Sequence, residues 1–176
     1  MSAVTDATID VKPRTPLAAD VTADPFPFLL HVFYLSSTNQ VLGIHATDPT
    51  AAFNTSLHIM ADEAVFADPE SQLTVIWHRC YPYQCPDTLL LVYQNADKQL
   101  WLRNGTSSGP VEYPLPVSAA NASGLALILS PSEEDRGLLR LFFEGNTTGV
   151  LKSMEWHSNE TLGNGWELCK CFFTPL

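Results

Sequence analysis

Five asparagines open an Asn-x-Ser/Thr triplet, the acceptor sequence for N-linked glycosylation: Asn54, Asn104, Asn121, Asn146 and Asn159. The chain has eight Asn and 28 Ser plus Thr, from which chance gives roughly one such triplet. All five fall in expected turns, where a glycan would have to be attached. The alternative is that these residue types simply cluster in turns. The triplets favour a secreted glycoprotein. Because residues 1–26 lack the basic and apolar segments of a secretory signal, a cytoplasmic location is the alternative.

The four cysteines are compatible with either compartment. Cys80 and Cys85 bracket a short loop that a disulfide could close. Cys169 and Cys171 lie two apart on an expected strand, so they share a face and cannot bond each other without strain. Four cysteines allow three pairings, and the sequence does not choose among them. Neither spacing is typical of a zinc site, so we expect no metal.

No motif of a known catalytic class is present in the sequence. It has no Gly-x-Ser-x-Gly elbow, no His-Glu-x-x-His and no glycine-rich phosphate loop. The five histidines are dispersed, and a structural role is expected for those on predicted strands, His31, His45 and His78. We expect no cofactor. The net charge of −10 argues against nucleic acid and anionic membranes as partners, and no apolar run is as long as a membrane span.

A long repeat indicates the architecture. Residues 28–40, 88–99 and 137–149 share a double Leu, an apolar and aromatic run and a polar turn, and their cores align at 30–34, 90–94 and 139–143, spaced 60 and 49 residues apart. The second and third units each hold four short expected strands. Four antiparallel strands in about 50 residues form a β-propeller blade. We therefore predict an all-β chain with a flexible arm, 1–26, and a propeller region, 27–176, whose blades span about 27–70, 71–118 and 123–174. A β-sandwich is the alternative.

Residues 137–168 resemble one blade of the fungal fucose-specific lectins, six-bladed propellers of the Aleuria type. The residues that match are Arg140, Phe142, Phe143, Gly149, Leu151, Gly165 and Trp166. The resemblance extends more weakly over 73–116. It implies a sugar held between neighbouring blades by an Arg on the second strand, a Glu on the third and aromatic rings.

This resemblance places one ligand site in the third unit. Arg140 occupies the Arg position and Ser153 the Glu position, with Glu155 on the same strand face. Trp101, Trp156 and Trp166 are the candidate rings; packing between blades is the alternative for each. An ion pair with Glu155 is the alternative role for Arg140. The aligned positions of the other units hold Leu91 and Leu102, and His31 and Gly43.

Two functions are compatible with a family site that two units have lost. The first is a lectin-like protein that binds a small ligand or glycan. The second follows from fungal propellers that resemble these lectins and catalyse pericyclic steps, such as hetero-Diels–Alder cyclisation, in natural-product pathways; that chemistry needs a shaped cavity and donors but no nucleophile or metal. Three blades cannot close a ring. We therefore expect a homodimer or a missing half-propeller.

Overall fold

The computed structural model describes residues 11–22, 29–48, 50, 64–78, 88–106, 109–129, 138–146, 150–156 and 165–169. They form three antiparallel sheets, which confirms the all-β prediction. Sheet 1 has the order β1-β2-β3, sheet 2 the order β4-β5-β6-β7, and sheet 3 the order β11-β10-β9-β8. The strands are β1 (Ala18–Thr22), β2 (Leu29–Leu35), β3 (Val41–Ala46), β4 (Thr74–His78), β5 (Thr88–Gln94), β6 (Gln99–Thr106), β7 (Gly109–Ser118), β8 (Leu125–Leu129), β9 (Leu139–Glu144), β10 (Leu151–Trp156) and β11 (Glu167–Leu168).

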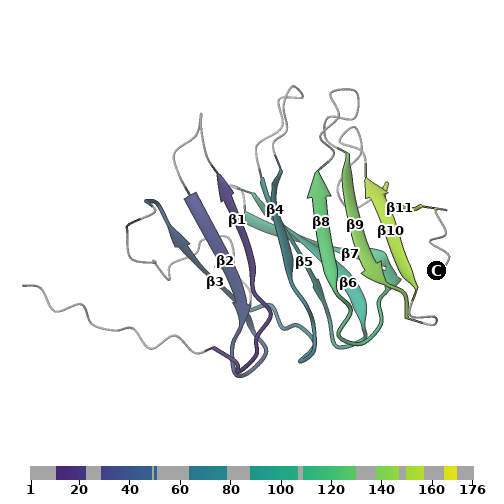
Figure 1. Cartoon of the computed structure of the whole chain (residues 1–176), viewed down its shortest axis with the longest axis horizontal. Coiled ribbons are helices and arrows are strands. Elements are labelled where there is room, and N and C mark those ends of the chain that lie inside the picture. The colour runs from purple at the N-terminus through teal and green to yellow at the C-terminus, as the bar shows by residue number, and fades with distance from the viewer. Residues whose placement is uncertain are drawn as a thin grey trace, which may run out of the picture.

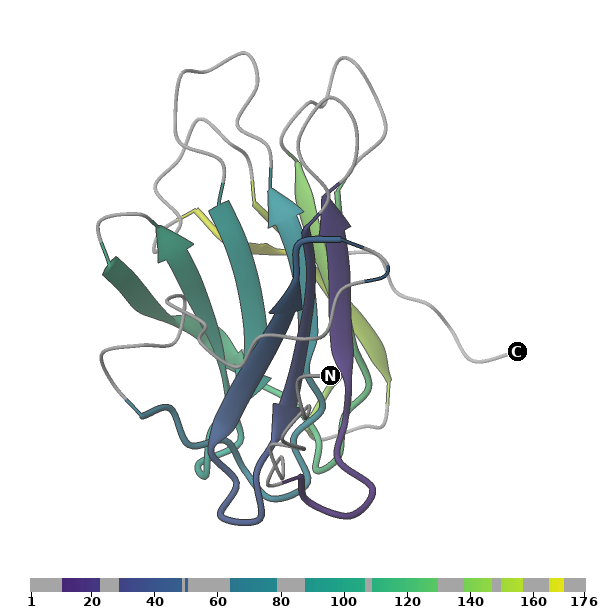
Figure 2. The ribbon, with the colours of Figure 1, turned by 90° about the vertical axis from the view of Figure 1, so that its left-hand side faces the viewer.

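The sheets follow one another in chain order (Figure 1). The first strand of each sheet packs beside the first strand of the next, β1 against β4 and β4 against β8. Viewed from the side of sheet 1, the strands of that sheet stand in front of the other two sheets (Figure 2). This stack of antiparallel sheets is the arrangement predicted for propeller blades, with three strands described in sheet 1 and four in each of the other two. Among the described residues there is no helix, and so none that could cross a membrane.

The flexible-arm prediction is wrong for residues 18–22. They form β1, which pairs with β2 from Ala18 opposite Phe33 to Thr22 opposite Leu29. Ala18 is buried in the core between sheets 1 and 2, so burial as well as strand pairing holds this segment. The polar neighbours Asp20 and Thr22 concealed the strand, because they broke the apolar run by which strands are recognised.

Alternation along the strands divides the core into two clusters. In β5, Leu89, Leu91 and Tyr93 belong to the core between sheets 1 and 2, whereas Leu90 and Val92 belong to the core between sheets 2 and 3. Sheet 2 is therefore covered on both faces. Sheets 1 and 3 each keep one face that no described element covers, and exposed apolar side chains lie there: Val21 on sheet 1, and Ile128 and Leu151 on sheet 3.

The same hydrogen bond between a side-chain hydroxyl and a backbone amide occurs once in each sheet, and we call it the hydroxyl junction. A Ser or Thr that precedes the sheet accepts a hydrogen bond from the N–H at the end of the second strand. The bonds are Leu35 N to Thr15 Oγ1 at 2.7 Å, Gln94 N to Ser71 Oγ at 2.9 Å, and Glu144 N to Ser123 Oγ at 2.8 Å. The carbonyls of the same three strand residues accept from the amides of Lys12, Asp68 and Ala120.

These hydroxyl junctions fix the true register of the repeat. Leu35, Gln94 and Glu144 are equivalent, at spacings of 59 and 50 residues rather than the predicted 60 and 49. Arg140, four residues before Glu144, therefore corresponds to His31 and to Leu90. The predicted alignment with Leu91 is wrong by one residue and selects the opposite face of sheet 2.

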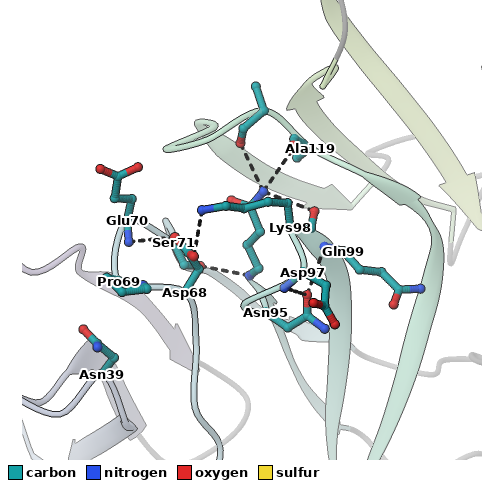
Figure 3. Close-up of polar contacts among 12 residues, drawn as sticks. Asn39, Asp68, Pro69, Glu70, Ser71, Asn95, Asp97, Lys98, Gln99 and Ala119 are labelled. Atoms are coloured by element: carbon teal, nitrogen blue, oxygen red, sulfur yellow. Dashed lines mark hydrogen bonds and ion pairs between the residues drawn. The ribbon is translucent and has the colours of Figure 1, made fainter.

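Polar side chains connect neighbouring junctions near the ends of the second strands (Figure 3). The Gln94 amide donates to the carbonyls of Lys98, Ala119 and Ala120, and so links sheet 2 to the segment that leads into sheet 3. Lys98 Nζ lies 2.7 Å from a carboxylate oxygen of the buried Asp68. The three bonds from Gln94 satisfy backbone carbonyls that would otherwise lack a side-chain donor, and the ion pair neutralises the buried Asp68 carboxylate.

We expect Ser71→Ala to lower the free energy of unfolding by about 1–3 kcal/mol, because the buried Gln94 N–H would lose its acceptor. Urea unfolding followed by tryptophan fluorescence measures this change. Ser118→Ala, at an exposed position of β7, is the matched control and should leave the midpoint unchanged. Equal midpoints for the two variants would contradict the structural role of the junction.

His31 makes the interface between sheets 1 and 2 sensitive to acid. Its ring is 3% exposed and stacks on Trp77, with centroids 6.0 Å apart. Burial and the neighbouring His45 lower the pKa of His31 to about 4, against an opposing effect of Asp20. The unfolded state, with a pKa near 6.5, therefore binds the proton first, and stability falls as the pH drops from about 6.5 towards about 4.

We expect His31→Phe, which keeps a ring for stacking but does not titrate, to lose less stability on acidification. Urea midpoints at about pH 7 and about pH 4.5 measure the difference for both proteins. An identical drop in the wild-type protein and the variant would exclude His31 as the source.

Candidate functional site

The structure brings Arg140 and Glu155 together as an ion pair on sheet 3. They lie directly opposite each other on β9 and β10, and Arg140 Nη2 donates to Glu155 Oε1. Arg140 alternates with Leu139 and Leu141, which face sheet 2, so the pair lies on the uncovered face. The Arg140 side chain is 41% exposed, yet its Nε is buried and has no hydrogen-bond partner.

Ser153 shares this face and is tied to Cys169. Ser153 lies opposite Phe142, and its side chain is buried. The Cys169 thiol hydrogen-bonds with Ser153 and Glu155, and the Cys169 amide donates to the Ser153 carbonyl at 2.9 Å. Burial raises the pKa of the Cys169 thiol, and so does the neighbouring Glu155 carboxylate. Cys169 therefore helps to hold the two β10 side chains in place.

Trp156 and Trp166 do not join Arg140. Both are buried in the core between sheets 2 and 3, on the opposite face of sheet 3, and the Trp156 ring meets His78 edge-on at 5.6 Å. Their predicted role in the Arg140 site is wrong: successive side chains on β10 point to opposite faces, which turns Trp156 away from Glu155, and Trp166, just before β11, is buried in the same core as Trp156. The same rule identifies Phe142, two residues from Arg140, as the half-buried aromatic residue on the site face.

The equivalent positions in the other sheets have different chemistry. Leu90 and Asn104 face sheet 3 within sheet 2, and the Thr88 hydroxyl donates to the Asn104 side chain. His31 and His45 lie opposite each other in sheet 1, with ring centroids 6.3 Å apart. Among the described sheets, sheet 3 alone combines a guanidinium with a carboxylate at this pair of positions.

The glycosylation and disulfide predictions have mixed outcomes. Asn104 lies within β6 and is 7% exposed, so its placement in a turn was wrong, and its side chain is buried where a glycan would have no room. Asn121 and Asn146 lie in turns and are exposed. Cys169 is a free thiol. The remaining predicted residues, Asn54, Asn159, Cys80, Cys85 and Cys171, lie outside the described ranges.

No three His, Cys, Asp or Glu side chains gather as a potential metal site within the ranges that the structure describes. The chemistry available on the sheet 3 face is therefore that of hydrogen bonding by a neutralised ion pair next to an aromatic ring. Such a set can orient a polar ligand with vicinal hydroxyls.

A scan of protein-family models and a search of curated proteins found no match to the sequence. Solved structures do match its fold. A six-bladed β-propeller fungal lectin from Aleuria aurantia shares 15% identity at a TM-score of 0.70, over 94% of this chain and 49% of that one. AofleA from Arthrobotrys oligospora shares 20% identity at 0.70, over 92% and 44%. The SapL1 lectin, solved with α-methyl fucoside, shares 16% identity at 0.65, over 89% and 46%.

The chain thus spans about half the length of the lectins it matches. Its three consecutive antiparallel sheets correspond to part of a six-bladed ring. The chain has the fold of a partial β-propeller of the fungal fucose-lectin type.

Proposed function

We propose that the chain is a lectin-like protein that binds a glycan through Arg140 and Glu155. The observation that carries this proposal is the ion pair on the uncovered face of sheet 3, beside a buried Arg140 Nε that has no partner. The pair holds the guanidinium in place while leaving donor capacity for a ligand. Because the two charges cancel, a neutral sugar enters without adding a buried charge. The lectin-like fold makes fucose the first sugar to test.

The neighbouring side chains suit the same ligand. Phe142 presents an aromatic ring on the site face, where it can lie against the C–H face of a sugar. Ser153 and Cys169 hydrogen-bond with each other beside Glu155 and so limit its movement. No described residue pattern favours the pericyclase alternative over this binding role.

We further propose that a second copy of the chain covers the site. In a ring of six blades, the uncovered faces of sheets 1 and 3 each receive a neighbouring blade, and two copies of three sheets supply the required six. The exposed apolar residues Val21, Ile128 and Leu151 lie on these two faces. Sheet 1 of the second copy would then form the other wall of the Arg140 site.

We expect Arg140→Ala to weaken α-methyl fucoside binding by at least about tenfold, because the charged donors to the sugar hydroxyls are lost. Isothermal titration calorimetry measures the affinity. Lys152→Ala, on the same sheet but directed towards sheet 2, is the control and should bind like the wild-type protein. Wild-type protein that binds no fucosylated glycan on an array would exclude the proposal.

We expect light scattering after size exclusion to give twice the 19.4 kDa chain mass. Ile128→Glu, which places a charge on the uncovered face of sheet 3, should convert the dimer to a monomer. Ser118→Glu, at an exposed position of sheet 2, is the charge-matched control. A wild-type protein that is monomeric at all concentrations would contradict assembly from two copies.

A further inference from the structure

A second group of polar side chains lies between sheets 1 and 2, away from the Arg140 site. Its centre is Arg103 on β6, whose side chain is 2% exposed. Arg103 pairs with Leu91, which belongs to the core between these two sheets, so its side chain faces sheet 1. A buried guanidinium normally has all its donors paired.

Arg103 is only half satisfied. Its Nη1 donates to Glu112 Oε1 at 2.7 Å, and the Tyr93 hydroxyl donates to the same oxygen at 3.0 Å. Burial and Glu112 raise the pKa of the Tyr93 hydroxyl, so it remains protonated and able to donate. Arg103 Nε and Nη2 are buried and have no partner. These two nitrogens form one side of the guanidinium, the side that can bind both oxygens of a carboxylate.

Three further nitrogens without partners belong to the same interface. Trp77 Nε1 and Trp101 Nε1 are buried, and both indole rings pack against the core between sheets 1 and 2. His45 Nδ1 is also buried without a partner; His45 lies opposite His31, whose ring stacks on Trp77. The two indole N–H groups and the two free Arg103 nitrogens can only donate.

We propose that the interface between sheets 1 and 2 binds a small carboxylate, with both of its oxygens on Arg103 Nε and Nη2 and a further hydrogen bond from the indole of Trp101, two residues away on the same face of β6. A carboxylate accepts without donating, which matches a set of donors. A neutral hydroxyl would have to donate its own hydrogen, whereas Glu112 Oε1 already accepts two hydrogen bonds. This site is independent of the proposed fucose site, since it uses other residues and another interface.

The indole N–H signals of the four tryptophans report binding directly in ¹⁵N–¹H spectra. On titration with sodium D-glucuronate, we expect the Trp101 signal to shift, with millimolar affinity, while the signals of Trp156 and Trp166 in the other interface stay in place. D-Glucose has the same ring with a hydroxymethyl group in place of the carboxylate. Glucose shifts equal to those of glucuronate, or no shift of Trp101, would overturn the proposal.

Two variants each remove hydrogen-bond donors while keeping the charge or the aromatic ring, so that a loss of hydrogen bonds can be told apart from a loss of packing. Arg103→Lys keeps the charge but loses the two-nitrogen edge and should weaken glucuronate binding about tenfold. Trp101→Phe keeps an aromatic ring but loses its donor, and should weaken binding about threefold even if the Lys variant does not fold. Trp166→Phe is the matched control in the other interface and should bind normally. Unchanged affinity in Trp101→Phe would overturn the assigned contact.

Discussion

The structure depends on one constraint: a sheet with apolar side chains on both faces must be covered on both sides. Sheet 2 meets this requirement, since all seven residues of β5 are buried between the neighbouring sheets. Sheets 1 and 3 meet it on one face only, and the site of Arg140 and Glu155 lies on such a face. In the proposed assembly, covering the uncovered faces and completing the candidate binding site would therefore be the same structural event.

The hydroxyl junctions connect this stacking to the chemistry of the sites. Each fixes the end of a second strand by hydrogen bonds to its amide and its carbonyl, and thereby fixes which residues of that strand face the next sheet. Because side chains alternate, a slip of one residue would bury Arg140 in the core and expose Leu141. A hydroxyl on the preceding segment thus controls the position of a guanidinium four residues further back along the strand.

The sequence predicted the sheets better than it predicted their faces. The repeat identified the four-stranded units, because turns and apolar runs recur at similar positions. The face of β5 could not be read from its residues, since Leu89, Leu90 and Leu91 are all apolar and give no alternation. In β10 the alternation was readable, and it would have placed Trp156 and Glu155 on opposite faces of the sheet. Arg103 was missed as a functional candidate because nothing local in the sequence reveals which of its nitrogens lack partners.

One pair of positions shows how this scaffold separates fold from function. In sheet 3 the pair is Arg140 with Glu155, in sheet 1 it is His31 with His45, and in sheet 2 it is Leu90 with the hydrogen-bonded Asn104. In each pair the two residues are cross-strand partners, and the three pairs occupy equivalent positions of the repeat. The backbone therefore does not require an ion pair there. A lectin gains avidity by repeating one weak site. Three different pairs on one repeated backbone instead allow each interface its own ligand chemistry. The proposed sugar site uses the ion pair of sheet 3, whereas the carboxylate site proposed between sheets 1 and 2 uses Arg103 of sheet 2, which faces sheet 1.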